Sequence, residues 1–175
     1  FSQTEIEAST RVLASGKVNY WTGQECREFE REFAKFAGTQ KCVALSNGTL
    51  ALDAIWAALG IGAGDEVIVT PRSFMASASS VVMAGAIPVF ADVDADSQNI
   101  TPQSVEHLIN ARTRAILGVH LAGWPCDMDA MKKLVSGRNI ALVEDCAQAH
   151  GASLNGVPVG SLSDAAAWSF CQDKI

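Results

Sequence analysis

Short apolar runs alternate with amphipathic helical patterns from residue 41 to the end of the chain. The pattern predicts six strands, and the apolar runs that mark them lie at 42–45, 66–70, 88–93, 115–121, 140–144 and 165–170. Between them, the spacing of apolar residues predicts helices over 49–59, 73–84, 102–110 and 127–136. Strands that alternate with helices usually form a mainly parallel sheet with helices on both faces. We therefore predict an α/β three-layer sandwich.

The first 40 residues follow a different pattern, with helices expected over 4–15 and 24–37. Gly16 and Gly38 follow these helices directly and suit C-cap positions. We interpret residues 1–40 as an N-terminal helical segment that packs on a large α/β domain formed by residues 41–175. The last expected strand ends five residues before the end of the sequence, so we expect a truncated domain that belongs to a longer chain.

The composition narrows the class of protein. The 175 residues carry 13 Lys and Arg against 19 Asp and Glu, a formal charge of −6, and 49% of them are hydrophobic. Such a chain folds around a core, and its net negative charge argues against a nucleic-acid partner. No apolar run approaches the ~20 residues of a membrane helix, so no membrane partner is expected. The five cysteines include no CxxC pair and no zinc-ligand spacing, which favours reduced thiols, a cytoplasmic location and no metal site.

A first candidate binding motif joins the first expected strand to a helix, with the sequence Ser46-Asn47-Gly48-Thr49. Unpaired backbone N–H groups and the helix dipole favour an anion at such a place. Gly48 would let a ligand approach the backbone, and the Thr49 hydroxyl would add a polar contact. Taken alone, the tetrapeptide fits an ordinary helix cap better than an anion site.

Two more candidate residues follow strands at the same expected edge of the sheet, namely Asp145 and Lys174. A buried carboxylate needs a cation or good donors, and a desolvated lysine amine can form a Schiff base. A helix cap or an ion pair at Asp145, and a solvated loop lysine at Lys174, are the structural alternatives. His120 and His150 are placed to reach the same crevice. An anion cradle, a carboxylate and a lysine together suit pyridoxal 5′-phosphate (PLP), which combines a phosphate, a cationic ring nitrogen and an aldehyde.

Four segments carry a more specific signal than any single motif: SNGTLALDAIWAALGIGAGDEVIV (46–69), PVFADVD (88–94), VHLAGWPCDMDAM (119–131) and VEDCAQAHGASLNGVPVGSLSDAAAWSF (143–170). With them the chain resembles the DegT/DnrJ/EryC1/StrS family of PLP-dependent sugar aminotransferases, which have the aspartate-aminotransferase fold type I. The resemblance implies that Lys174 is the catalytic lysine that holds the cofactor, and that Asp145 contacts its pyridine nitrogen. The other implied cofactor contacts are Gly48, Thr49 and Ser169 at the phosphate, Phe74 on the ring and Gln148 near the 3′ oxygen.

The resemblance also implies an activity: transamination of a nucleotide-linked keto sugar in amino-sugar biosynthesis, with glutamate as the expected amino-acid donor. It implies a homodimer with a shared active site. It further implies, beyond residue 175, an antiparallel strand between those at 42–45 and 165–170, and then a small C-terminal domain. Two alternatives remain open. One is a PLP-dependent sugar dehydratase of the same family, which would carry His where Lys174 stands; the other is a non-catalytic regulatory relative.

Overall fold

The computed structural model describes residues 1–174, and the chain divides into two compact units. The first unit is Phe1–Ala44, and the second begins at Leu45. Within the described residues, no helix combines the length and the apolar character needed to cross a membrane.

The first unit contains the two helices expected from the sequence, α1 (Gln3–Ser15) and α2 (Glu25–Ala37). Ser2 caps α1, because its side chain accepts a hydrogen bond from the first turn. Gly16 and Gly38 end the two helices with left-handed backbones, at φ values of 69° and 70°. Glycine adopts this conformation without strain, and this explains why each helix ends where it does.

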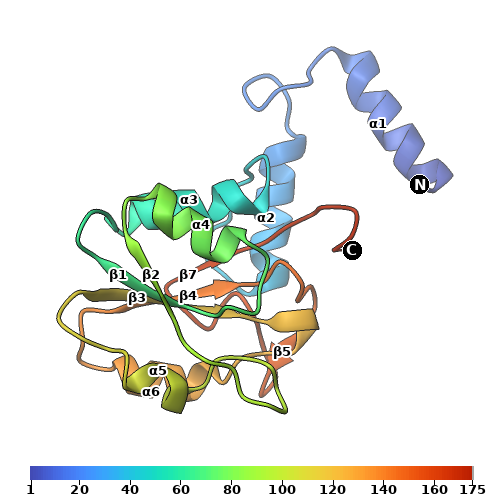
Figure 1. Cartoon of the computed structure of the whole chain (residues 1–175). Coiled ribbons are helices and arrows are strands. Elements are labelled where there is room, and N and C mark those ends of the chain that lie inside the picture. Colours follow the sequence, from blue (N-terminus) through green and yellow to red (C-terminus); the bar gives the residue numbers. More distant parts are fainter. Residues whose placement is uncertain (175) are drawn as a thin grey trace. The chain divides into compact units, whose positions relative to one another are not determined.

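The second unit is built on a parallel sheet whose strand order is β2-β1-β3-β4-β7 (Figure 1). Its strands are β1 (Glu66–Val69), β2 (Ile87–Phe90), β3 (Thr113–Val119), β4 (Ala141–Asp145) and β7 (Ala165–Ala167). Every neighbouring pair runs parallel. The carboxyl ends of all five strands therefore meet at one edge of the sheet, where ligands bind in folds of this kind.

Helices cover both faces of this sheet, which confirms the predicted α/β sandwich (Figure 1). The helices are α3 (Gly48–Ala58) and α4 (Ala76–Met83) on one face, and α5 (Pro102–Glu106) and α6 (Met128–Val135) on the other. Neighbouring residues of a strand point to opposite faces. Leu117 of β3 accordingly packs in the core beneath α3 and α4, whereas Ile116 packs in the core on the side of α5 and α6.

A short hairpin lies between β4 and β7 and consists of β5 (Ser153–Leu154) and β6 (Val157–Pro158). Asn155 and Gly156 join these strands with φ values of 52° and 80°. Two left-handed residues in a two-residue loop make the turn that hairpins favour. The Asn-Gly pair therefore forms the tight turn expected from the sequence.

The strand expected at 42–45 is absent, and that prediction was wrong. Val43 and Leu45 are exposed, and no described residue pairs with this segment in a sheet. A strand needs backbone hydrogen bonds to a neighbouring strand, and an apolar run without such a neighbour stays irregular.

Several other elements are shorter than expected: α4 begins at Ala76 and β2 ends at Phe90, and two more, α5 and β7, end early. Helix α5 ends at Glu106, because Leu108 and Ile109, which follow the cap residue His107, close tighter turns through bonds to the third residue before them. Strand β7 ends at Ala167 rather than at Phe170, because its partner β4 ends at Asp145 and the chain then turns away. These errors concern where an element begins or ends, which depends on contacts that a local pattern does not contain.

Candidate active site

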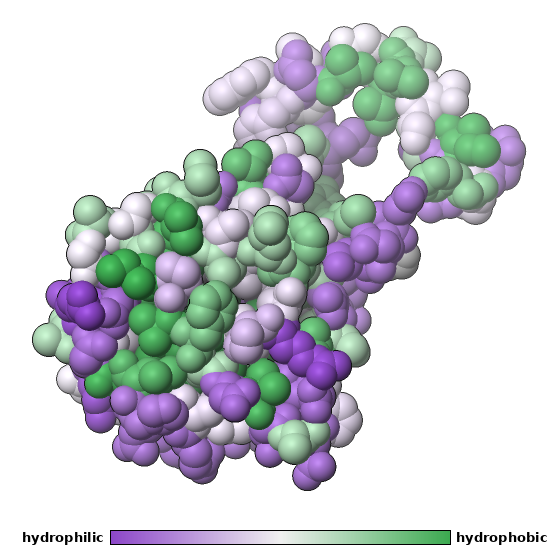
Figure 2. Space-filling view, viewed as in Figure 1, coloured by the Kyte–Doolittle hydropathy of each residue, from purple (hydrophilic) through white to green (hydrophobic). Residues whose placement is uncertain are grey.

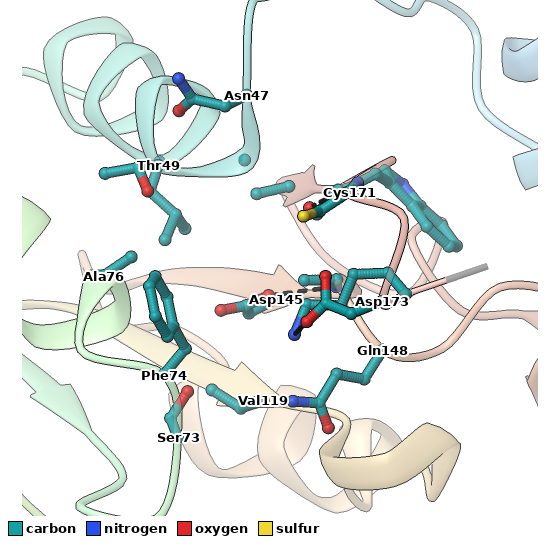
Figure 3. Close-up of a pocket in the computed structure, with 17 residues that line it drawn as sticks. Asn47, Thr49, Ser73, Phe74, Ala76, Val119, Asp145, Gln148, Cys171 and Asp173 are labelled. Carbon is teal, nitrogen blue, oxygen red and sulfur yellow. Dashed lines mark hydrogen bonds and ion pairs between the residues drawn. The ribbon is translucent and has the colours of Figure 1, made fainter.

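A pocket of about 310 Å³ lies at the carboxyl edge of the sheet, beside the N-terminus of α3 (Figure 3). Its walls come from α3, from the segment before α4, from the ends of β3 and β4, and from the chain that follows β7. The seven residues that the resemblance assigns to the cofactor all line it: Gly48, Thr49, Phe74, Asp145, Gln148, Ser169 and Lys174. The structure brings these residues together, and the individual role of each stays a prediction.

Asp145 is the buried acid of the pocket, with 7% of its surface exposed. The Ser77 hydroxyl donates to Oδ2 at 2.9 Å, and the backbone N–H of Ala147 donates to Oδ1 at 3.1 Å. Within residues 1–174, no lysine or arginine forms an ion pair with this carboxylate. Burial raises the pKa of Asp145 above its ordinary value, although the two hydrogen bonds oppose the shift. The pocket thus contains a buried carboxylate that lacks a cationic partner.

Glu144, the preceding residue, is fully buried on the other side of β4 and is well paired. Its Oε1 accepts from His120 Nε2 at 3.0 Å and from the Gly160 N–H at 2.7 Å. Its Oε2 accepts from the Leu162 N–H at 3.0 Å and from the Ser163 hydroxyl at 2.7 Å. Burial alone would raise the pKa of Glu144, but these donors outweigh it and lower the pKa below its ordinary value.

His120 therefore does not reach the pocket, and that expectation was wrong. The ring is fully buried, and its Nδ1 accepts a hydrogen bond from the Cys126 N–H at 3.0 Å while Nε2 faces Glu144. Together with Cys146, these groups place His, Cys and carboxylate ligand atoms within 4.8 Å of one another. Both ring nitrogens of His120 are already engaged, so the geometry is that of a hydrogen-bonded network.

His150 also lies outside the pocket lining, and its ring packs against Trp168 and Phe170 with centroids 5.2 Å and 5.1 Å away. Burial lowers the pKa of His150. The expectation that this histidine lines the crevice is therefore wrong as well.

The N-terminus of α3 approaches the chain that follows β7. Asn47 caps the helix, and its side chain accepts a hydrogen bond from the first turn at 2.9 Å. A Cβ atom at Gly48 would lie 3.0 Å from the Trp168 carbonyl oxygen and 3.2 Å from Ser169 Cβ, so a side chain there would need the chain to shift. The hydroxyls of Thr49 and Ser169 line the same pocket. Unpaired N–H groups of a first helical turn, together with such hydroxyls, can bind a phosphate.

Lys174 follows β7 in a turn, which its own N–H closes by donating to the Cys171 carbonyl oxygen at 2.8 Å. The side chain is 19% exposed, and Nζ lies 3.5 Å from an Asp173 carboxylate oxygen. Lys174 lines the same pocket as Asp145, and its positive charge lowers the pKa of that acid without an ion pair between them. A molecule in the pocket can therefore contact the amine and the acid together.

Gln148 and Phe74 contribute two further pocket contacts (Figure 3). Gln148 Oε1 accepts a hydrogen bond from the Ala122 N–H at 2.8 Å. Its Nε2 has no partner among residues 1–174, so the amide can donate to an oxygen in the pocket. The ring of Phe74 is 66% exposed and lines the pocket, as a ring that stacks on a planar ligand would.

Two residues of this site, Ser73 and Ser77, are not among those predicted from the sequence. Ser73 lines the pocket, and its Oγ lies 2.6 Å from the buried Oγ of Ser77, which in turn donates to Asp145. A spacing of four residues at the start of an expected helix was the available signal, because such residues share one side of a helix.

The chemistry of these groups fits PLP. The helix terminus suits the phosphate, and the lysine amine suits the aldehyde. The strongest indication is Asp145, which is buried, forms no ion pair within residues 1–174 and so suits a protonated ring nitrogen.

The sequence profile of the DegT/DnrJ/EryC1/StrS aminotransferase family matches residues 1–175. The chain belongs to this family. A relative from Aneurinibacillus thermoaerophilus, dTDP-3-amino-3,6-dideoxy-alpha-D-galactopyranose transaminase, is 46% identical over 169 residues. That match covers 96% of this chain and 46% of the relative. The predicted family is thus confirmed, and the relative named here is an aminotransferase.

Solved structures of family proteins agree closely with this fold. The aminotransferase from Psychrobacter cryohalolentis is 59% identical with a TM-score of 0.98, over 99% of this chain and 44% of that chain. The PLP form of Spr1654 from Streptococcus pneumoniae, a candidate sugar aminotransferase, is 33% identical with a TM-score of 0.91, over 98% of this chain and 47% of that chain. The chain therefore spans somewhat less than half the length of the relatives it matches.

Proposed function

We propose that the full-length protein is a PLP-dependent aminotransferase that acts on a nucleotide-linked keto sugar in amino-sugar biosynthesis, with glutamate as the amino donor. The observation that carries this proposal is the pocket in which Asp145, buried without a cation, and Lys174 lie together. The relatives support the substrate class, since one of them is named for a dTDP-linked amino sugar.

The residues of the chain hold and orient the cofactor. When bound, PLP supplies an aldehyde that accepts an amine and a protonated pyridine ring that acts as an electron sink. Asp145 keeps the ring nitrogen protonated, because a buried carboxylate without a cation gains most from a positive partner. Phe74, which lines the pocket, would lie against the ring, and Gln148 would donate its amide N–H to the 3′ oxygen.

The phosphate and the aldehyde are held at the two ends of the pocket. The first turn of α3, with Gly48 and Thr49, binds the phosphate together with Ser169. Lys174 would hold the aldehyde, and its amine, once free, would move the proton that transamination requires between the α-carbon of the donor and C4′ of the cofactor. Tying the phosphate down orients the cofactor for that proton transfer.

The sugar dehydratase is the second candidate, and Lys174 argues against it, because the dehydratases that the sequence resembles carry His at this position. A non-catalytic relative would have no reason to keep the full set of pocket residues. The two enzymatic candidates differ in product: the aminotransferase transfers nitrogen to the sugar, and the dehydratase removes its hydroxyl as water.

The decisive experiment is reductive trapping on the full-length protein. Borohydride treatment of protein incubated with PLP should fix the cofactor on the peptide that contains Lys174, as read by mass spectrometry. Lys174→Ala should take no label and should transfer nitrogen at least 10²-fold more slowly, since proton transfer by a positioned group contributes about 10²–10⁴-fold. Labelling of a different lysine contradicts the assignment. Nitrogen-15 from labelled glutamate should appear in the sugar product; a product that has lost a hydroxyl and gained no nitrogen points to the dehydratase.

A homodimer and a cytoplasmic location complete the proposal. Apolar side chains gather over the face of α3 and α4 (Figure 2). Large apolar side chains are exposed on α4 and β2, among them Val82, Met83, Ile87 and Phe90. Exposed apolar groups of this kind often belong to an interface between protein chains. Light scattering of the full-length protein checks the dimer.

The five free thiols suit a reducing compartment, which supports the proposed cytoplasmic location.

A further inference from the structure

Two serine hydroxyls connect the wall of the pocket to its buried acid. Ser77 lies near the start of α4 with 1% of its surface exposed, and its Oγ donates to Asp145 Oδ2 at 2.9 Å. Ser73, which lines the pocket, places its own Oγ 2.6 Å from Ser77 Oγ. The three side chains therefore form a continuous chain of hydrogen bonds.

This chain has a direction. A serine hydroxyl carries one proton, and that of Ser77 is used on the ionised carboxylate. The Ser73 hydroxyl must then donate to Ser77 Oγ. Each donor polarises the next, which strengthens the final bond to the acid.

The result is a carboxylate fixed at both of its oxygens. Ser77 holds Oδ2, and the Ala147 N–H holds Oδ1 at 3.1 Å, so rotation of the Asp145 carboxylate would break one of the two bonds. An acid that lacks an ion pair within residues 1–174 has no other strong restraint on its orientation.

We propose that Ser77 is a positioning residue, supported by Ser73, that orients Asp145 and strengthens its charged form for contact with a cationic ring nitrogen. The proposal rests on the proposed PLP function and adds to it the group that prepares the acid. Ser77 touches neither cofactor nor substrate in this role and acts through Asp145 alone.

The charged surroundings of Asp145 allow a clean test. Besides the hydrogen bonds, the groups that act on its pKa are His120, at the end of β3, and Lys174, beyond β7. The neighbouring Cys146 thiol is held neutral, because burial raises its pKa well above the ordinary value. Removing the neutral Ser77 hydroxyl changes none of these charges, so any shift in the Asp145 titration reports the lost hydrogen bond.

Ser80 provides the matched control. It lies one turn further along α4, is equally buried with 1% exposed, and accepts a hydrogen bond from Trp56 Nε1 at 2.9 Å. Ser80→Ala removes the same atom from the same helix, and its partner is a core residue outside the pocket lining. Any general cost of losing a buried hydroxyl in α4 therefore appears in both variants.

The experiment compares full-length wild type, Ser77→Ala, Ser73→Ala and Ser80→Ala. The Asp145 carboxyl is first titrated without cofactor by NMR with ¹³C-labelled aspartate, and its signal is assigned by its loss in Asp145→Asn. Ser77→Ala should move the midpoint to higher pH, because the charged form loses a donor, and Ser73→Ala should move it less in the same direction. Ser80→Ala should leave it in place.

The loaded enzyme gives the second readout. Ser77→Ala should slow the reaction with the amino donor by about 10-fold, which is the effect of one hydrogen bond to a charged group. It should also move the acidic limb of the pH–rate profile to higher pH. A Ser77→Ala protein that matches Ser80→Ala in both midpoint and rate profile overturns the positioning role. If wild type itself does not bind PLP at Lys174, the proposed function is overturned. This outcome is distinguishable from a failure of the positioning role, because it is seen in the protein without any substitution.

Discussion

Glu144 and Asp145 are adjacent acids at the end of one strand, and they lie in opposite environments. Glu144 faces the side of α5 and α6 and accepts four hydrogen bonds, which lower its pKa. Asp145 faces the side of α3 and α4 and accepts two, and burial raises its pKa. The first acid is satisfied by the fold, whereas the second is left incompletely paired beside a pocket. Perturbed and underpaired groups of this kind tend to mark functional sites, because folding alone gives no reason to bury them.

The largest expected effect comes from Asp145→Asn, which removes the charge and keeps the shape. We expect transamination by the full-length protein to slow on the order of 10²-fold or more, because an oriented charge in a buried site is worth several kcal/mol. Steady-state rates at saturating donor measure this effect. Turnover equal to that of wild type contradicts the ring-nitrogen role.

The same variant should be at least as stable as wild type without cofactor. Ionising an acid whose pKa is raised on folding costs stability, and this cost develops as pH rises through the folded pKa. Asn removes the cost, and the Ser77 hydroxyl can turn to accept from the new amide. Urea unfolding should show a gain for Asp145→Asn at pH 7 that shrinks at low pH.

Glu144→Gln should have the reverse outcome, a loss of stability of about 2 kcal/mol, since a buried donor without a partner costs about 1–3 kcal/mol. Each Glu144 oxygen accepts from a backbone N–H, of Gly160 or Leu162, and neither N–H can turn around to accept from an amide. Because the folded pKa of Glu144 is lowered, its contribution is present above the unfolded pKa and is lost as pH falls through the folded one. The loss of stability relative to wild type should therefore shrink in acid, just as the gain of Asp145→Asn does, so the two variants differ in the sign of their effect at pH 7.

Gly48→Ala tests the other end of the pocket. The added Cβ must displace the Trp168 carbonyl or Ser169, so we expect the affinity for PLP to fall about 10-fold, an amount that corresponds to about 1.4 kcal/mol. Gly62→Ala is the control, because its Cβ would meet only the Ala84 carbonyl oxygen at 3.8 Å. Absorbance titration of the cofactor-free proteins measures both affinities, and equal losses in the two variants contradict the cradle.

The smallest effect is expected at the helix caps. Asn47→Ala and Thr101→Ala each remove a side chain that caps a helix, α3 beside the pocket and α5 on the other face. Each should lower stability by about 1 kcal/mol. Only Asn47→Ala should also weaken PLP binding, because α3 alone of the two presents its N-terminus to the pocket. If Asn47→Ala bound PLP as tightly as wild type, the cap of α3 would have no role in cofactor binding.

The sequence predicted that Glu144 and Asp145 end a strand at the edge of the sheet, but it did not predict the hydrogen-bond partners of either acid. The run that ends in Glu144 and Asp145 identified the end of a buried strand, and strand alternation places the two on opposite faces. The partners come from elsewhere in the chain: Ser77 lies 68 residues from Asp145, and Ser163 lies 19 residues from Glu144. Which acid is underpaired therefore could not be read from the local pattern. The same limit explains His120, whose partner Glu144 lies 24 residues away.

The close approach of Gly48 to Ser169 has a consequence for the order of events during folding. About 120 residues separate these two halves of the proposed phosphate cradle. Bringing the ends of so long a segment together costs much chain entropy, and this cost arises before the contacts that offset it can form. A chain emerging from the ribosome makes α3 long before β7, and the cradle is complete only when β7 has docked on β4. A cofactor held by this cradle would therefore bind the finished sheet rather than assist its early stages. Through mass action it favours that last docked state over every partly folded one.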